Sequence, residues 1–249
     1  MNEIADNLRT VLQRMQSACA RSGRAPDAVG LIAVSKTFPA AAIAAAVAAG
    51  QRRFGENYLQ EALGKVEALA EAGLEWHFIG PIQSNKTREI ATHFAWVHGV
   101  ERLRIIERLS AQRPLGLPAL NVCVQVNISG EASKSGCSVT QTPELCAAIA
   151  ALPRLRLRGL MAIPEAVADA DDVRPTFRRL RMLFERIRAD GAVNLADFDT
   201  LSMGMSGDFE VAIEEGATLV RVGSAIFGAR QSSNPDPVTP QPLKNRNPS

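Results

Sequence analysis

The sequence predicts a single (β/α)8 barrel of the α/β class, in which eight parallel strands alternate with surrounding helices. Eight short runs rich in β-branched residues begin between residues 31 and 218, about 27 residues apart on average, which is close to one strand plus its crossover helix. Segments of helical period lie between these runs, and several end in glycine, as helix C-caps do. A doubly wound sheet is the alternative, but its smaller number of strands would leave part of these units unexplained.

An amphipathic helix is predicted before the first strand, over residues 4–19. Its apolar residues recur at helical spacing, and the segment from Gly23 to Pro26 then ends the helix. The residues expected on its buried face are Ile4, Leu8, Val11, Leu12, Met15 and Cys19.

The predicted strands are short, apolar and bounded by turn residues. They are LIAVS from Leu31, RFGENY from Arg53, WHFIG from Trp76, AWVHGV from Ala95, VCVQVN from Val122, LRGLMAI from Leu157, DTLSMG from Asp199 and TLVRVG from Thr218.

Three of the intervening helices have a clear helical period. They are PAAAIAAAVAAG from Pro39, ENYLQEALGKVEAL from Glu56 and RPTFRRLRMLFERIRADG from Arg174. In the last of these, we expect Phe177, Leu180, Phe184 and Ile187 to pack on the barrel and the arginines to form a solvated face.

Residues 1–230 are predicted to form one barrel domain, and residues 231–249 a disordered C-terminal tail. The tail consists mainly of proline, serine and asparagine and has few apolar residues with which to build a core.

Composition excludes several classes of function. The net charge of +2, from 28 basic and 26 acidic residues, leaves no electrostatic signature of nucleic-acid or anionic-membrane binding. No apolar run is long enough to span a membrane, and the first ten residues mix acids and bases where a secretory signal would be basic and then apolar. We therefore expect a soluble, cytoplasmic protein.

The cysteines and histidines do not predict a metal site. Cys19, Cys123, Cys137 and Cys146 form no CxxC pair and lie in or beside apolar segments, which favours buried, reduced thiols. The three histidines have no ligand spacing.

Lys36 is the strongest candidate for chemistry. It is one of only five lysines among 28 basic residues, and it ends the first predicted strand with the same parity as Ile32 and Val34, toward the barrel interior. Active sites of such barrels lie at the carboxyl ends of the strands. Desolvation there would lower the pKa of a lysine and make its neutral amine a nucleophile for an aldehyde, giving a Schiff base. The alternative is an ion-paired lysine whose stem is buried and whose ammonium lies in solvent.

Two loops predict an anion site. The segment LSMGMSGDFEVAIEEGA from Leu201 places Ser202 and Ser206 before a helix, and a second such turn, with Gly223 and Ser224, follows strand eight. Barrels often bind phosphate between the loops after strands seven and eight. The alternative is that Ser206 or Asp208 only caps the helix.

Arg221 has the parity of an inward residue on strand eight, so its guanidinium needs an acceptor. A carboxylate such as Glu56 or Glu210, or a ring nitrogen of a ligand, would serve. Asn57 could supply a neutral donor near Lys36, and Lys134, in the loop GEASKSG, is the main rival to Lys36.

Taken together, these features suggest pyridoxal phosphate (PLP) in a barrel, and the sequence resembles the YggS/PROSC family of pyridoxal phosphate homeostasis proteins, relatives of the alanine racemase N-terminal domain. The resemblance extends from the first strand to the last. Its segments are AVSKTFP at 33–39, FGENYLQEA at 54–62, WHFIGPIQSNK at 76–86, GEASKSG at 130–136, GLMAIP at 159–164 and LSMGMSGDFEVAIEEGATLVRVGSAIFG at 201–228.

The resemblance implies a fold type III PLP-binding barrel and a role for each matching position. Lys36 is expected to carry the cofactor as a Schiff base and Arg221 to face the pyridine nitrogen. The phosphate is expected near Ser206, Gly223 and Ser224, with Ser202, Met203 and Asn57 beside the cofactor.

Three functions are compatible with this set of residues. The first is a non-catalytic, monomeric carrier that keeps PLP (vitamin B6) and amino-acid pools in balance and supplies recipient apo-enzymes. The second is a monomeric amino-acid racemase that uses Lys36 and a loop residue such as Tyr58. The third, an aldolase that uses the lysine without a cofactor, leaves Arg221 without a role.

Overall fold

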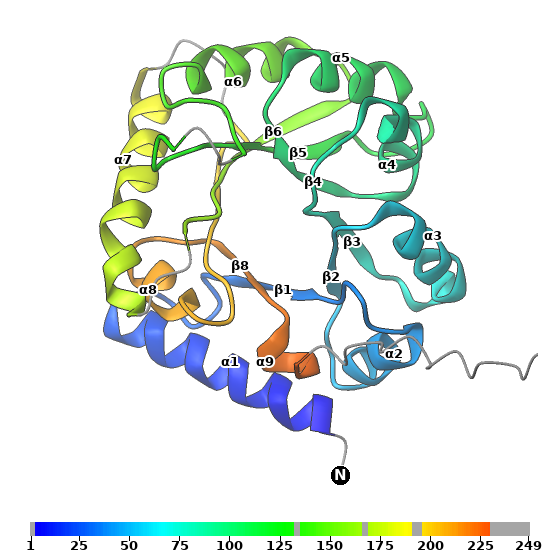
Figure 1. The fold of residues 1–249 in the computed structure, drawn as a ribbon, viewed down its shortest axis with the longest axis vertical. Helices are drawn as coiled ribbons and strands as arrows, with labels where there is room; N and C mark the ends of the chain where they lie inside the picture. The colour runs from blue at the N-terminus through cyan, green and yellow to red at the C-terminus, as the bar shows by residue number, and fades with distance from the viewer. Residues whose placement is uncertain (1–2, 132–134, 166–168, 191–195, 230–249) are drawn as a thin grey trace, which may run out of the picture.

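The structure, a computed structural model, describes residues 3–131, 135–165, 169–190 and 196–229. Eight parallel strands pair in chain order, and β8 pairs with β1 to close the barrel (Figure 1). The predicted fold class is therefore confirmed. The strands are β1 (Gly30–Val34), β2 (Arg53–Glu56), β3 (Glu75–Phe78), β4 (Trp96–Val100), β5 (Leu120–Gln125), β6 (Leu155–Met161), β7 (Thr200–Ser202) and β8 (Leu219–Val222).

The helices form a ring outside the strands (Figure 1). They are α1 (Glu3–Arg21), α2 (Ala40–Ala48), α3 (Leu59–Ala68), α4 (Thr87–His93), α5 (Leu103–Gln112), α6 (Thr142–Ala151), α7 (Arg174–Asp190), α8 (Phe209–Glu214) and α9 (Ser224–Phe227), with 3-10 turns η1 (Ala70–Ala72), η2 (Ser84–Lys86) and η3 (Ala170–Val173). The extra N-terminal helix is confirmed, except that Leu12, predicted to be buried, is 39% exposed.

Several strands are shorter than predicted because the chain turns away at their carboxyl ends. The first strand ends at Val34, and Thr37 then adopts a left-handed φ of 69°. A β-branched residue enters this region only when its surroundings hold it there. Lys36 therefore lies in the turn after β1 rather than on the strand.

The barrel interior combines apolar and polar side chains. One buried apolar cluster consists of Ile32, Trp96, Cys123, Met161 and Leu219. The main apolar core is a separate cluster that includes the buried faces of α1 and α7. The polar side chains inside the barrel belong to the site described below.

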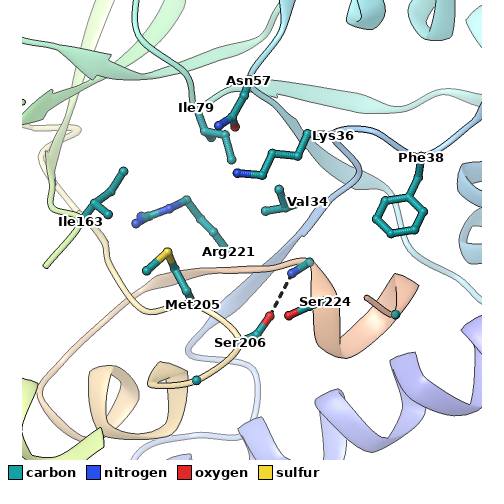
Figure 2. A pocket seen from close by; sticks show the side chains of 13 residues that line it. Val34, Lys36, Phe38, Asn57, Ile79, Ile163, Met205, Ser206, Arg221 and Ser224 are labelled. Carbon is teal, nitrogen blue, oxygen red and sulfur yellow. Dashed lines mark hydrogen bonds between the residues drawn. The ribbon is translucent and has the colours of Figure 1, made fainter. Parts of the chain in front are cut away.

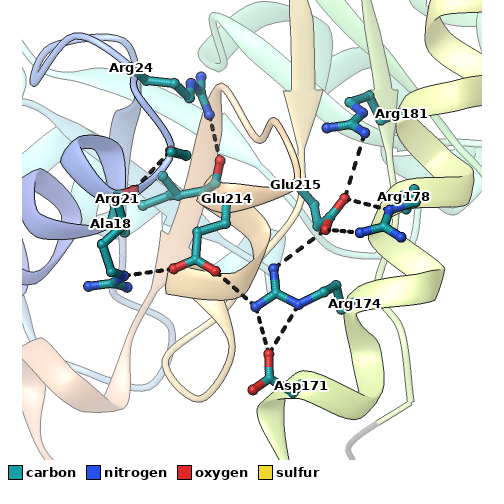
Figure 3. Close-up of polar contacts among 11 residues, drawn as sticks. Ala18, Arg21, Arg24, Asp171, Arg174, Arg178, Arg181, Glu214 and Glu215 are labelled. Atoms are coloured by element: carbon teal, nitrogen blue, oxygen red, sulfur yellow. Dashed lines mark hydrogen bonds and ion pairs between the residues drawn. The ribbon is translucent and has the colours of Figure 1, made fainter.

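Ion pairs join α1, α8 and α7 on one side of the barrel (Figure 3). The carboxylate of Glu214 pairs with Arg21 of α1 at 2.9 Å and with Arg174 of α7 at 2.8 Å. Glu215, whose side chain is 5% exposed, pairs with Arg178 at 2.9 Å. Part of the arginine face of α7 is therefore paired rather than only solvated, while its predicted apolar face is buried.

The four cysteines are free and buried, as predicted. Burial raises the pKa of the thiols of Cys123 and Cys146 to about 12, so both remain protonated at neutral pH. Within the described ranges there is no cluster of three metal-ligating side chains and no helix long and apolar enough to cross a bilayer. The predicted tail and Lys134 lie outside the described residues.

Candidate functional site

A cavity of about 350 Å³ opens at the carboxyl ends of the strands (Figure 2). It is lined by six of the residues predicted from the sequence, which come from opposite ends of the chain: Lys36, Asn57, Ser206, Arg221, Gly223 and Ser224. The sequence analysis missed the remaining lining residues, Val34, Phe38, Ile79, Ile163, Met205, Gly207 and Gly228. Apolar walls with a few convergent polar groups are typical of small-molecule sites.

The side chain of Lys36 points into this cavity from the turn after β1 (Figure 2). The residue is half-buried, so its stem is shielded while its amine faces the space shared with Arg221. The amine of Lys36 therefore lies where a ligand in the cavity could reach it.

A buried ionic cluster fixes both neighbours of Lys36. The ammonium of Lys65 on α3 donates to the Ser35 carbonyl at 2.8 Å and to Glu56 Oε1 at 2.7 Å, and it also pairs with Glu61. The Ser35 hydroxyl donates to Glu56 Oε1 at 2.6 Å, and the Thr37 amide donates to Glu61 Oε1 at 2.6 Å. The backbone on each side of Lys36 is therefore tied to side chains of β2 and α3.

Within this cluster, Glu56 is fully buried. Burial raises the pKa of its carboxyl, although hydrogen bonds from Lys65 and Ser35 act in the opposite direction. The sequence analysis gave Lys65 no role, because the contact between α3 and the end of β1 is not visible in either segment alone.

Arg221 lies at the floor of the cavity and is 3% exposed. Its guanidinium donates to Ser202 Oγ at 2.7 Å and to the Ala162 carbonyl at 3.0 Å. Burial lowers its pKa to about 10. Neither Glu56 nor Glu210, the carboxylates suggested from the sequence, pairs with Arg221.

Those two carboxylates are held by other cations. Glu56 pairs with Lys65, and Glu210 pairs with Arg14 of α1 at 2.8 Å. The guanidinium of Arg221 consequently meets neutral oxygen acceptors and the cavity.

The loops after β7 and β8 meet at Ser206. Its hydroxyl oxygen accepts from the amides of Gly223 at 3.2 Å and Ala225 at 3.4 Å. A Cβ atom at Gly223 would lie 3.1 Å from the carbonyl oxygen of Val34, so glycine permits the close approach of β8 to β1 here. The hydroxyl of Ser224, which is exposed, lies beside that of Ser206 (Figure 2).

The alternative, in which Ser206 or Asp208 only caps the following helix, differs from what the structure shows. Asp208 occupies the N-cap position of α8, but its side chain makes no capping hydrogen bond to the helix. It accepts instead from the amide of Met205. The side chain of Ser206 instead contacts the loop after β8.

Asn57 follows β2 directly and lines the cavity wall. Its Oδ1 atom is buried and has no hydrogen-bond partner in the described part of the chain. An unpaired buried carbonyl oxygen is unfavourable, so this atom is suited to accept a hydrogen bond from a ligand.

Two predicted residues do not line the cavity. Ser202 is fully buried below Arg221, where its hydroxyl contacts both Arg221 and His98. Met203, which directly follows β7, is buried in the main apolar core. The methionine at the cavity is Met205, two residues further along (Figure 2).

Residues 2–231 match the alanine racemase N-terminal domain family. The pyridoxal phosphate homeostasis protein of Pseudomonas aeruginosa is 60% identical over 235 residues, which cover 94% of this chain and 99% of that protein. The protein of the same name from Escherichia coli K12 is 52% identical over 236 residues, with the same coverage. The chain belongs to the pyridoxal phosphate homeostasis protein family.

Solved structures support this family membership. The structure of PipY from Synechococcus elongatus PCC7942 with PLP bound is 35% identical, has a TM-score of 0.77, and covers 90% of this chain and 100% of PipY. An alanine racemase from Corynebacterium glutamicum, at 15% identity and a TM-score of 0.63, shares the fold. The fold and family expected from the sequence motifs are thus confirmed.

Proposed function

We propose that this protein binds PLP in the cavity at the carboxyl ends of the strands and maintains intracellular PLP and amino-acid balance without strong catalysis. It would act in the cytoplasm as a monomer and supply the cofactor to recipient apo-enzymes. The main support for the proposal is that Lys36, Arg221 and the two loops joined at Ser206 and Gly223 (the loop pair) all line one cavity. The printed names of the relatives and the PLP-bound PipY structure support it.

The residues present fit each part of the cofactor. Lys36 offers an amine for the aldehyde, and Arg221 offers a cation for the pyridine nitrogen. The hydroxyls of Ser206 and Ser224 offer donors for the phosphate, and the Gly223 amide, which donates to Ser206 Oγ, holds the two loops together beside them. When bound, PLP supplies a reactive aldehyde and a ring that can act as an electron sink.

The position of Arg221 limits the bound cofactor to chemistry that needs only a weak electron sink, such as proton exchange at an α-carbon. A permanent cation beside the pyridine nitrogen disfavours protonation of that nitrogen, which weakens the ring as an electron sink. Because Arg221 is buried and held by Ser202 and Ala162, its charge stays at the cavity floor.

The racemase alternative needs a base on each face of the cofactor. Tyr58, the candidate second base, is 55% exposed and does not line the cavity. The aldolase alternative leaves both Arg221 and the loop pair at Ser206 without a ligand to bind.

The function is tested with the purified protein titrated with PLP. We expect saturable binding, a visible absorption band between roughly 300 and 500 nm that borohydride removes, and no racemisation of the common amino acids. Failure to bind PLP would refute the proposal. Rapid racemisation of an amino acid would favour the racemase alternative.

Ser224→Asp is expected to weaken PLP binding about tenfold. A carboxylate here adds like-charge repulsion against a phosphate held by the Ser206 and Gly223 loops, and the exposure of Ser224 keeps that repulsion moderate. Equilibrium dialysis measures the effect, with Ser224→Ala as the matched neutral variant. Equal affinities for the two variants would place the phosphate elsewhere.

A further inference from the structure

A line of hydrogen-bonded side chains runs through the barrel interior from the cavity floor to the opposite end. Arg221 on β8 donates to Ser202 Oγ on β7 at 2.7 Å, and Ser202 Oγ lies 2.9 Å from Nδ1 of His98 on β4. His98 Nε2 lies 2.9 Å from Nδ1 of His77 on β3, and His77 Nε2 lies 3.0 Å from Glu75 Oε1. Both histidines and Ser202 are completely buried.

Glu75 ends this line at the amino-terminal mouth of the barrel. Together with His77 it lines a second cavity of about 450 Å³ there. The line thus joins a cation at one end of the barrel to a carboxylate at the other.

The direction of every hydrogen bond in the line can be deduced from its ends. A guanidinium only donates, so Ser202 Oγ accepts from Arg221 and its own hydrogen is available for His98 Nδ1. A carboxylate only accepts, so His77 donates from Nε2 to Glu75. A neutral His77 then accepts at Nδ1 from His98 Nε2–H, which leaves His98 Nδ1 as the acceptor for Ser202. Starting from Arg221 or from Glu75 therefore gives the same donor and the same acceptor for each hydrogen bond.

The surroundings favour neutral histidines in this line. Burial lowers the pKa of His77 and places that of His98 well below its usual value, and Arg221 acts in the same direction on His98. The indole of Trp96 stacks on both rings, at centroid distances of 5.4 and 5.7 Å.

Two arginines near the Glu75 end of the line are paired with carboxylates. Arg53 pairs with Glu75 at 3.2 Å, and Arg158 pairs with Asp199 at 2.7 Å while its guanidinium lies over Trp96. Glu75 is held ionised, since the hydrogen bond from His77 lowers the pKa of its carboxyl against the effect of burial.

The reverse arrangement is unfavourable. If His98 donated from Nδ1 to Ser202, the Ser202 hydrogen would have no acceptor, since the described residues give Ser202 Oγ no partner besides Arg221 and His98. A buried hydroxyl without an acceptor destabilises the site. An added proton on the pair would also bring a second positive charge toward Arg221.

We propose that His98 and His77, both neutral and protonated at Nε2, are positioning residues that turn the Ser202 hydroxyl away from Arg221 and so hold the guanidinium at the cavity floor. This role rests on the proposed function only in that the ligand facing Arg221 is PLP. The orientation of the histidines themselves is a property of the chain alone.

The orientation is tested first, without any cofactor, by two-bond 15N–1H correlation NMR of the uniformly 15N-labelled full chain at pH 7. We expect two rings with bare Nδ1 and protonated Nε2, assigned with His98→Asn and His77→Asn, and His93 as the more exposed reference. A ring protonated at Nδ1, or at both nitrogens, in His77 or His98 would overturn the proposal. This outcome does not depend on whether the protein binds PLP.

The positioning role is tested with His98→Leu and His98→Asn. Leucine removes the acceptor for Ser202, whereas the asparagine Oδ1 can replace Nδ1. In the PLP-loaded protein, we expect His98→Leu to shift the visible absorption band and to weaken binding severalfold, and His98→Asn to restore both. An unchanged band and affinity in a folded His98→Leu, verified by its thermal melt, would overturn the proposal, as would an equal change in both variants.

Discussion

Replacing Lys36 by alanine is expected to abolish the borohydride-dependent attachment of PLP to the protein. Lys36 is the lysine that lines the cavity in the described part of the chain, and a covalent link to the aldehyde requires a primary amine within reach. Lys65 on α3 is committed to Glu56, Glu61 and the Ser35 carbonyl. Its ammonium is therefore not available as a nucleophile.

The measurement is peptide mass spectrometry after incubation with PLP and reduction by borohydride. In the unchanged protein the label should lie on the peptide containing Lys36. Lys86→Ala, at the end of η2, is the matched control and should label normally. A label on Lys134 or Lys86 in the unchanged protein would contradict the assignment.

The same variant separates covalent from noncovalent binding. Because Lys36→Ala leaves Ser206, Gly223 and Ser224 in place, it should still retain PLP noncovalently, and more of it than Ser224→Asp does. Retention in Ser224→Asp together with complete loss in Lys36→Ala would mean that the loop after β8 is not the phosphate site.

Lys65→Met is expected to lower the free energy of unfolding by about 3–5 kcal/mol, because removing one partner leaves a buried carboxylate without its cation. Glu56 is fully buried, and the side chain of Lys65 is 6% exposed. The change also releases the Ser35 carbonyl, which now accepts from the Lys65 ammonium. The turn that carries Lys36 would then lose part of its support.

This destabilisation should grow with pH. Burial already raises the pKa of Glu56 above its usual value, and loss of the lysine raises it further. A carboxyl whose pKa is raised in the folded state is favoured there in its neutral form, so stability falls as pH rises through that folded pKa. Lys65→Met should therefore be less damaging at pH 5 than at pH 8.

Urea unfolding at the two pH values measures both effects. The matched control is the double variant Lys65→Met with Glu56→Gln, in which the unpaired charge is removed. This variant should recover part of the lost free energy of unfolding, and the difference between the two pH values should disappear. A loss below 1 kcal/mol, or one that is the same at both pH values, would show that Glu56 and Lys65 are not coupled as the structure indicates.

The sequence by itself determined the barrel, the family and six of the residues that line the cavity. Strand and helix periods are local properties of the chain, and closing eight strand–helix units brings their carboxyl ends together wherever those units lie in the sequence. For this reason the strand-end positions of Lys36, Asn57 and Arg221, together with the glycine- and serine-rich turns at 204–207 and 223–224, indicated six of the cavity residues.

Only the tertiary structure decided which polar groups meet. His98 and Ser202 are 104 positions apart, and Lys65 reaches the Ser35 carbonyl across 30 positions, so neither contact leaves a pattern in its own segment. The sequence placed Met203 at the site and offered Glu56 or Glu210 as one possible acceptor for Arg221. In the structure Met203 packs in the main apolar core, and other cations pair with those two carboxylates. A hydrogen bond or ion pair forms only when the distance between two atoms is right to within a few tenths of an ångström, and the closed barrel fixes the distances between atoms on different elements.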